Sequence, residues 1–330
     1  MLFDLRLRFD FCHGGWYNGL YESRESARKI VKTLFRPEGG ERMRIGIATT
    51  DFPTLPCVEL MDRIQGYGFE AVQLSLADVA EIGFTTNGEI EIPEALDPAV
   101  VARIGRQARA RNIPLVALNG TFNMAHPDVA VRAEGLRRLE GLARAANALE
   151  VSLITLCSGT RNRAHLWRPH PENGTPEAWQ DMMDTMEQAV ALAERYGLTL
   201  AIETEAANVV DTAEKARRVL GALDSPRLKM VLDGANLFQA GRAKPEYVEE
   251  TLRHAFVLFG NDVVIAHGKD IRASEGIHFC TTGHGILNFP LMLELLQAHC
   301  GDCDMILHGI EREDQMPGAL AWMRGLRNET

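Results

Sequence analysis

The sequence has few cysteines and no recognisable secretory signal, and both absences restrict the class of protein. Six cysteines are scattered over 330 residues. Without a signal for export, we expect reduced thiols and a cytoplasmic protein. Cys300 and Cys303 form one C-x-x-C pair, but the second pair that would complete a zinc site is missing. We therefore interpret this pair as an ordinary loop between a helix and a strand.

Long apolar runs and an excess of basic residues are also missing. No stretch approaches the roughly 20 apolar residues that a membrane-spanning helix needs. The formal net charge is -10, whereas proteins that bind nucleic acid or an anionic membrane surface cluster lysine and arginine. We expect neither of these partners, and small polar molecules and cations stay open. The 46% of hydrophobic residues suffices for one large core.

The first 42 residues differ in character from the rest of the chain. They carry eight basic and six acidic residues, a net charge of +2, which leaves -12 for residues 43–330. Charges interrupt their apolar residues too often for a signal-peptide core. Met43 then opens the β-like stretch "MRIGIATTDFP". We predict that residues 1–42 are an N-terminal extension outside the fold, with Met43 as an alternative start, and that residues 43–330 form one domain.

From Met43 onward, short β-branched runs alternate with longer amphipathic stretches. Eight runs have the pattern of strands: residues 44–49, 71–76, 114–120, 151–157, 198–203, 228–233, 262–267 and 304–309. Eight consecutive strand and helix units imply right-handed crossovers and an all-parallel sheet. The predicted fold is α/β, a single-domain (β/α)8 TIM barrel. A doubly wound sheet is disfavoured because no G-x-G-x-x-G follows the first strand.

The last four predicted strands end in residues that bind metals. These residues are Glu203, Asp233, His267 and His308. Taken singly, an aspartate before glycine is often a turn residue, and a histidine on a strand is often structural. In a barrel, however, all four side chains would meet at the C-terminal mouth, where such enzymes carry their chemistry. Carboxylate and imidazole donors there suit one divalent cation: Mn²⁺, Mg²⁺, Co²⁺ or Zn²⁺.

Several longer motifs support a family resemblance. They include "IETEAANVV", "VLDGANLF", "IAHGKDI", "GHGILNFPLMLELL" and "ILHGIEREDQMPGALAWMRGL". With "IGIATTDFP", they resemble the xylose isomerase-like TIM barrel superfamily, in its sugar phosphate isomerase/epimerase branch, over residues 44–327. The resemblance implies a divalent cation held by Glu203, Asp233 and His267. At the fourth position His308 stands where a glutamate is usual in the family.

The resemblance implies a metal-dependent isomerase or epimerase of carbohydrate metabolism. Its substrate would be a sugar, a sugar acid or an inosose, and a proton would move next to a carbonyl through a metal-stabilised enediolate. Glu203 is the expected base, and His308 is either its partner acid or only a ligand. Because a second glutamate is missing, a dehydratase and a non-catalytic sugar-binding barrel stay open. A nuclease is disfavoured by the acidic charge, and a homodimer is a further expectation from the resemblance.

Four more residues are candidates for substrate contact. Residues 158–174 are too long for a routine connection and would lie over the mouth. In this segment Trp167 could stack on a sugar and Arg161 could hold a carboxylate or phosphate, unless the segment is only an exposed loop. Lys269 would contact substrate or form a surface ion pair. Glu205 shares a strand face with the predicted base and would orient a hydroxyl or replace the missing glutamate.

Overall fold

The computed structural model describes residues 42–301 and 303–329. Residues from Met43 onward form one compact unit. The predicted extension lies, apart from Arg42, outside the described residues, so the extension and the alternative start at Met43 stay predictions. In the described part of the chain, no helix combines the length and apolar character needed to cross a membrane. The cytoplasmic location is likewise still a prediction.

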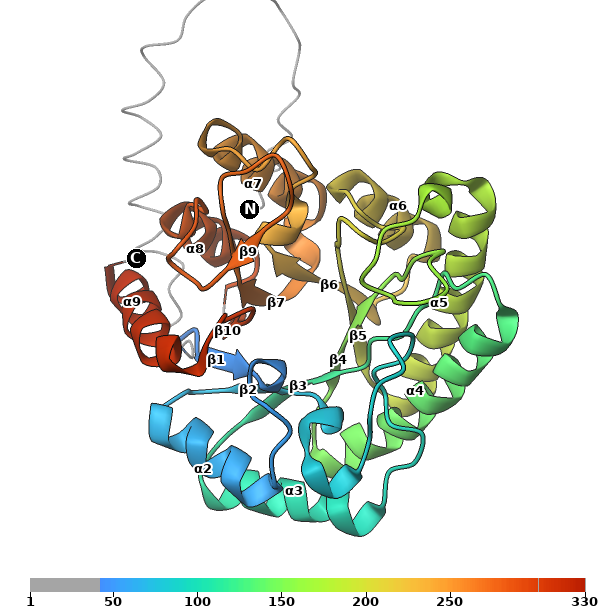
Figure 1. The fold of residues 1–330 in the computed structure, drawn as a ribbon, viewed down its shortest axis with the longest axis vertical. Helices are drawn as coiled ribbons and strands as arrows, with labels where there is room; N and C mark the ends of the chain where they lie inside the picture. Colours follow the sequence, from blue (N-terminus) through green and yellow to red (C-terminus); the bar gives the residue numbers. More distant parts are fainter. Residues whose placement is uncertain (1–41, 302, 330) are drawn as a thin grey trace, which may run out of the picture. The chain divides into compact units, whose positions relative to one another are not determined.

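Eight parallel strands close into a barrel in the order β1-β10-β7-β6-β5-β4-β3-β2. They are β1 (Ile45–Ala48), β2 (Val72–Leu74), β3 (Leu115–Asn119), β4 (Leu153–Cys157), β5 (Thr199–Glu203), β6 (Leu228–Asp233), β7 (Val263–Gly268) and β10 (Asp304–Leu307). In Figure 1 the strands form the central ring. All eight predicted strands are present, with bounds within two residues of those expected. The predicted (β/α)8 barrel is therefore confirmed.

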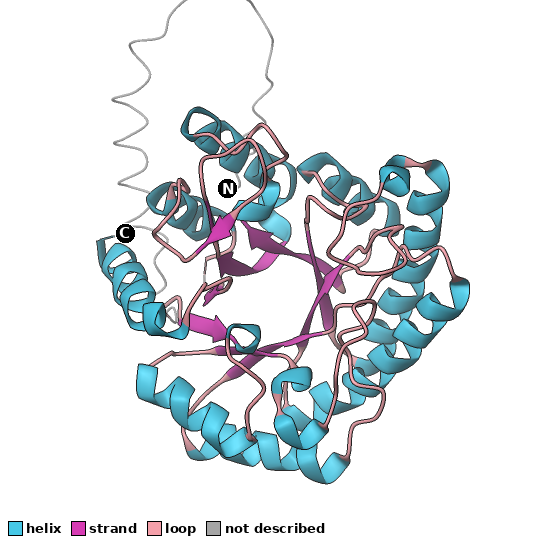
Figure 2. Ribbon diagram, in the orientation of Figure 1, coloured by secondary structure: helices cyan, strands magenta, loops and turns pink. Residues whose placement is uncertain are grey.

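The helices lie outside this ring of strands (Figure 2). They are α2 (Cys57–Tyr67), α3 (Pro98–Ala110), α4 (Val129–Leu149), α5 (Pro176–Tyr196), α6 (Ala213–Leu223), α7 (Pro245–Phe259), α8 (Phe289–His299) and α9 (Met316–Glu329). Helix α5 shows how the sequence sets such bounds. The Thr175 side chain accepts a hydrogen bond from the backbone N–H of Ala178, and Gly197 ends the helix with a φ of 70°.

Small and branched apolar side chains fill the inside of the barrel. The inner cluster contains Ala71, Ala117, Ala201, Val231, Ile265 and Ile306. Each lies two positions before a polar residue that is in the same strand or directly follows it, except Ala71, which directly precedes β2 and its Gln73. Because residues i and i+2 share one face of a strand, the polar residues form the next layer towards the C-terminal mouth. The barrel interior thus supports a ring of polar side chains.

Two further features lie outside the barrel strands. A two-stranded antiparallel sheet, β8 (Asp270–Ile271) with β9 (Phe279–Cys280), follows β7. The buried Asp270 carboxylate accepts hydrogen bonds from several backbone N–H groups of this segment, so its role is structural. Cys300 and Cys303 lie between α8 and β10 as free thiols, with their sulfur atoms 2.9 Å apart. Their place agrees with the predicted loop between a helix and a strand.

Candidate metal and substrate site

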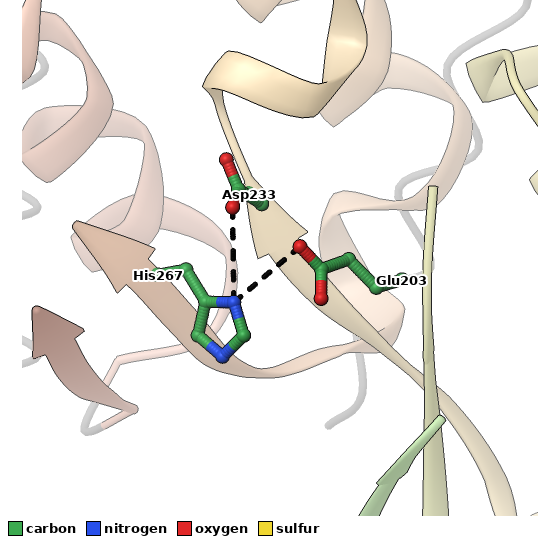
Figure 3. A group of neighbouring side chains, drawn as sticks. All are labelled: Glu203, Asp233 and His267. Carbon is green, nitrogen blue, oxygen red and sulfur yellow. Dashed lines mark ion pairs between the residues drawn. The ribbon is translucent and has the colours of Figure 1, made fainter. Parts of the chain in front are cut away.

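Three of the four predicted metal ligands come together at the mouth of the barrel. Glu203 ends β5, Asp233 ends β6, and His267 lies in β7 directly beside Asp233 in the strand register. His267 Nδ1 lies 3.4 Å from Glu203 Oε1 and 3.8 Å from Asp233 Oδ2. Figure 3 shows the three side chains pointing towards one another. One potential ligand atom from each residue lies within 4.8 Å of the others.

Burial makes the charges of this group strongly interdependent. Burial alone favours the neutral imidazole, but Glu203 and Asp233 outweigh it and raise the pKa of His267 to about 9. Burial alone would raise the pKa of Asp233 as well, yet Lys269 and His267 hold that pKa well below its usual range. Lys269 Nζ lies 3.0 Å from Asp233 Oδ2. Two acids and two bases thus compensate one another in the buried floor of the mouth.

Gln73, in β2, determines which nitrogen of His267 faces the carboxylates. His267 Nε2 lies 2.9 Å from Gln73 Oε1. The amide is oriented in turn, because Gln73 Nε2 donates to Thr155 Oγ1 and Thr155 Oγ1 donates to the carbonyl of Leu118. With its Nε2–H directed at Gln73, the imidazole can offer its Nδ1 lone pair to a cation. Such a partner on the second ring nitrogen is the usual arrangement of a metal-binding histidine.

The donor atoms of the group fit a divalent cation. His267 Nδ1 is buried and makes no hydrogen bond, and the nearest carboxylate oxygen, Glu203 Oε1, lies 3.4 Å away, so the nitrogen is free to bind a cation. Asp233 Oδ2 makes no hydrogen bond either, and its partner is the Lys269 ammonium at 3.0 Å. Asp233 Oδ1, by contrast, accepts bonds from the backbone N–H groups of Ala235 and Asn236. One imidazole nitrogen and carboxylate oxygens suit Zn²⁺ or Mn²⁺. Binding would displace the proton from Nδ1 of His267.

His308 stands at the edge of this group and faces other partners. Its ring lies edge-on to His267, with ring centroids 5.3 Å apart. Its Nδ1 lies 3.4 Å from both Thr50 Oγ1 and Asp51 Oδ1. Asp51 is held in place by the backbone N–H groups after His308, because Gly309 donates to its Oδ1. The structure therefore places His308, the predicted fourth ligand, beside the carboxylate of Asp51.

A cavity of about 380 Å³ opens above these residues. Its floor contains side chains from the strand ends, namely Gln73, Asn119, Thr155, Glu203, His267 and His308. Other lining residues lie beyond the barrel strands, namely Glu91, Trp167 and Gly309 in loops and Phe279 in β9. A cavity of this size is at the small end of the range for ligand sites in proteins. It is suited to a small polar molecule.

Three of the four predicted substrate residues line the cavity. Trp167 and Glu205 are lining residues, and burial raises the pKa of Glu205. Lys269 also lines the cavity and is buried, so it is not the surface ion pair that the sequence left as an alternative. Arg161 is not among the lining residues, because its guanidinium binds Asp181 Oδ2 at 2.6 Å. A role for Arg161 in holding a substrate anion is thus not supported by its position.

A comparison with protein families matches the model for the "xylose isomerase-like TIM barrel" over residues 61–326. The chain belongs to the xylose isomerase-like TIM barrel family. The resemblance of the sequence motifs to this superfamily is therefore confirmed. A comparison with curated protein sequences gives no match.

Solved structures with the same fold have low sequence identity to this family member. The 3-keto-D-glucoside 4-epimerase YcjR of E. coli is 17% identical, with a TM-score of 0.66 over 86% of this chain and 100% of its own. The IOLI protein with a bound zinc atom is 15% identical, with a TM-score of 0.63 over 87% of this chain and 97% of its own. The probable 3-DHS dehydratase AsbF of Bacillus anthracis is 13% identical, with a TM-score of 0.64 over 87% and 100%. These likenesses concern the fold.

Three residues of the site in this family member are not among those predicted from the sequence. Gln73 lies in a strand whose polar end carries no metal-binding residue type. Asn236 follows Asp233 in "VLDGAN", and its Nδ2 donates to Glu203 Oε1 at 2.6 Å. Glu91 lies in the long connection after β2, where no pattern singles it out. For Asn236 the sequence does carry a signal. It is a polar residue three positions after the aspartate that ends a strand, and such a residue lies close to that strand end.

Proposed function

We propose that this chain is a divalent-cation-dependent isomerase or epimerase that moves a proton next to the carbonyl of a small sugar or inosose. The grouping of Glu203, Asp233 and His267 under a small polar cavity carries this proposal. Family membership supports it, and so does the fold shared with a sugar epimerase. The zinc atom of the IOLI protein supports a divalent cation at this site.

Glu203 is the proposed base. Asn236 Nδ2 donates to its Oε1, which fixes the carboxylate at the cavity wall. A divalent cation bound at Glu203, Asp233 and His267 would polarise the carbonyl oxygen of a hydroxy-ketone and acidify the neighbouring C–H. The carboxylate then needs only to lie within hydrogen-bond reach of that proton. Lys269 contributes positive charge on the same side of the cavity, where negative charge develops on the substrate oxygen.

His308 is the proposed partner that returns the proton. Asp51 Oδ1 lies 3.4 Å from its Nδ1, so a proton on Nδ1 is stabilised there and Nε2 is left for the substrate. A carboxylate in this position orients an imidazole and fixes its tautomer. Glu205 lines the same cavity and is the second candidate for this role. Both residues lie outside the group of three potential ligands.

A dehydratase is the second candidate, because a probable dehydratase shares the fold. Removal of a proton next to a carbonyl can also begin the loss of water from the following carbon. The two reactions differ in their products, since an epimerase or isomerase conserves mass and a dehydratase loses one water. Mass spectrometry of the product therefore separates them.

Exchange of substrate hydrogen with solvent deuterium tests the proposal. The full chain, loaded with Mn²⁺ or Zn²⁺, is incubated in D₂O with a panel of ketoses and inososes. Deuterium at the carbon next to the carbonyl is then measured by NMR. We expect exchange with at least one compound, and its loss in Glu203→Gln. No exchange with any compound would contradict the proposal and favour a binding protein.

Metal analysis of Asp233→Ala tests the cation site separately. We expect the wild-type chain to retain about one cation and the variant to lose it, because Asp233 is one of the three protein ligands. Asp181→Ala removes a carboxylate that binds arginines outside the cavity and serves as the control. Full retention of the cation without Asp233 would exclude this site.

A further inference from the structure

A third carboxylate, Glu91, faces the cavity from the side opposite the histidine. It lines the cavity, and Asn119 at the end of β3 donates to its Oε2 at 3.1 Å. In the closed barrel β3 and β7 are four strands apart, which places Asn119 and His267 on opposite sides of the ring. Trp167 Nε1 donates to Glu91 Oε1 at 2.7 Å. Both carboxylate oxygens are thus held, and each keeps acceptor capacity for a ligand.

We propose that Glu91 binds the hydroxyl groups of an uncharged polyol and excludes phosphorylated sugars from the cavity. This inference rests on the proposed function, because it assumes that a sugar reacts in this cavity. Glu91 would bind the end of the sugar that does not react. The reacting end lies at Glu203 and His267. The indole of Trp167, fixed by Glu91, offers an apolar face to the C–H side of the same polyol. Glu91 therefore acts in substrate selection.

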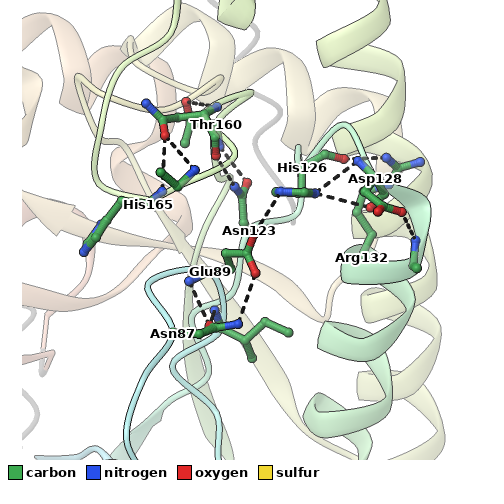
Figure 4. Close-up of polar contacts among 12 residues, drawn as sticks. Asn87, Glu89, Asn123, His126, Asp128, Arg132, Thr160 and His165 are labelled. Atoms are coloured by element: carbon green, nitrogen blue, oxygen red, sulfur yellow. Dashed lines mark hydrogen bonds and ion pairs between the residues drawn. The ribbon is translucent and has the colours of Figure 1, made fainter.

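The loops that carry Glu91 and Trp167 are fixed to each other and to the barrel. The backbone N–H of Glu91 donates to Thr121 O at 3.0 Å, and that of Leu166 donates to Gly88 O at 2.7 Å. Around them, Asn123 binds both neighbouring loops, because its backbone N–H donates to Glu89 O and its Oδ1 accepts from the N–H of Thr160. Figure 4 shows Asn123 between Glu89 and Thr160. A site on such supported loops holds its geometry before the ligand arrives.

The charges around the cavity disfavour a phosphate group. Glu91, Glu203 and Glu205 contribute carboxylates to its lining. Among the described lining residues, Lys269 is the only lysine or arginine, and its ammonium is engaged by Asp233 at 3.0 Å. A phosphate monoester carries nearly two negative charges at neutral pH. Placed near Glu91, it would be repelled by this carboxylate, and the described lining offers no lysine or arginine besides Lys269.

The hydrogen-bonding groups of the wall match hydroxyl donors. Asn236 lines the cavity with its side-chain amide. Glu91 and Glu205 add carboxylate oxygens, which accept hydrogen bonds and donate none when ionised. A polyol can donate one hydrogen bond from each hydroxyl, whereas an ionised phosphate offers only acceptors. The wall is thus complementary to an uncharged polyol in charge and in hydrogen bonding.

Matched pairs of free ketohexoses and their terminal phosphate esters test the inference. Solvent deuterium exchange gives kcat and KM for each compound with the Mn²⁺-loaded chain. We expect kcat/KM to favour the free sugar by at least about tenfold. In Glu91→Gln, we expect KM for the free sugar to rise by about tenfold with kcat within about twofold, because a remote binding contact is weakened. Discrimination against the ester should shrink in this variant.

Glu89→Gln is the matched control. Glu89 lies two residues earlier, outside the cavity lining, and its Oε1 lies 3.1 Å from His126 Nε2. Glutamine keeps an acceptor for this contact, so we expect unchanged KM values. Faster exchange with the esters than with the free sugars in the wild-type chain would overturn the inference. An unchanged KM in Glu91→Gln would do the same.

Calorimetric binding distinguishes this inference from the proposed function. If no compound exchanges deuterium, the proposed reaction is wrong, but binding of the free ketohexoses can still be measured. Binding that is weakened in Glu91→Gln and absent for the esters supports the role of Glu91. Tighter binding of the esters, or no binding of any free sugar, overturns it.

Discussion

His267 Nε2 lies 2.9 Å from Gln73 Oε1, although the two residues are 194 positions apart in the sequence. The contact joins β7 to β2 across the mouth of the barrel. It directs the other nitrogen, Nδ1, at Glu203 and Asp233. The proposed cation site requires a histidine held in one tautomer. The neutral side-chain amide of Gln73 provides this.

We expect Gln73→Leu to weaken binding of Mn²⁺ or Zn²⁺ by about 10- to 100-fold, the usual effect of losing a histidine's outer partner. Gln73→Glu is the matched variant, because its carboxylate still accepts from His267 Nε2. We expect its affinity to stay within about threefold of the wild type. Isothermal titration calorimetry measures both. Equal affinity in Gln73→Leu and the wild type would show that the contact with Gln73 does not orient His267 for cation binding.

Lys269 supplies the positive charge at Asp233 when no cation is bound. We expect Lys269→Met, with a chelator present, to lower the free energy of unfolding by about 3–5 kcal/mol, because Asp233 is left buried without its partner. A bound Mn²⁺ should recover most of this loss and should bind more tightly than in the wild type, since the ammonium no longer occupies Asp233 Oδ2. Urea unfolding with and without Mn²⁺ measures the effect.

Lys229→Met is the control for this change. Lys229 binds Asp262 at 2.9 Å with its side chain 29% exposed. The loss of this ion pair should lower the free energy of unfolding by about 1 kcal/mol or less, with or without Mn²⁺. If Mn²⁺ fails to restore Lys269→Met, the lysine stabilises the fold by some means other than compensating the site.

The fold followed from the sequence because each strand carries its own signal. In β6, for example, "LKMVLD" is a short apolar run that ends in a polar residue, and the structure gives Leu228–Asp233 without change. The alternation of side chains along a strand also holds at the mouth of the barrel. Val231 and Ile306 lie in the inner cluster, two positions before Asp233 and His308. A regular repeat of short local patterns therefore predicted a closed barrel.

The site was predicted only where residue type and strand end coincide. Glu203, Asp233 and His267 met both conditions and lie together. Gln73 met only the second, since glutamine is not a typical metal ligand, and Glu91 met neither because it lies in a loop. The contacts of Arg161 depend on Asp181 in α5, which local sequence does not reveal. Long-range side-chain contacts are thus the part of the site that the sequence left open.

Asp78 gives the stability of the chain a predictable dependence on pH. Burial raises the pKa of Asp78 to about 6, and the hydrogen bond from Thr49 offsets only part of this. The folded chain therefore holds a proton that the unfolded chain releases near pH 4. Its contribution is most favourable below pH 4 and is lost as the pH rises towards 6. Above pH 6 the charged, partly buried carboxylate destabilises the fold.

We therefore expect Asp78→Asn to stabilise the chain by about 2 kcal/mol at pH 7.5 and to have little effect at pH 4. Asparagine keeps an acceptor for Thr49 Oγ1. Asp97→Asn is the control, since Asp97 caps α3 through its side chain and asparagine caps equally well. Chemical unfolding at both pH values measures the difference. A gain of equal size at both would show that removing the charge is not the cause.

His308 is proposed to return the proton, and the alternative role is that of a fourth metal ligand. Its Nδ1 faces Asp51, and the group of three potential ligands does not include it. We expect His308→Gln to lower kcat for deuterium exchange by about 10²- to 10⁴-fold, the range for loss of a general acid or base. Its affinity for Mn²⁺ should stay within about threefold of the wild type.

Glu311→Gln is the control for His308→Gln, because Glu311 lies three positions further on and binds Arg272 at the surface, at 2.8 Å. We expect it to change neither kcat nor cation affinity. Parallel calorimetry and exchange measurements on both variants decide the role of the histidine. If His308→Gln loses the cation as Asp233→Ala does, His308 is a ligand, and Glu205 becomes the candidate for returning the proton. If it keeps both cation and activity, His308 is neither, and the proton must come from Glu205 or from solvent.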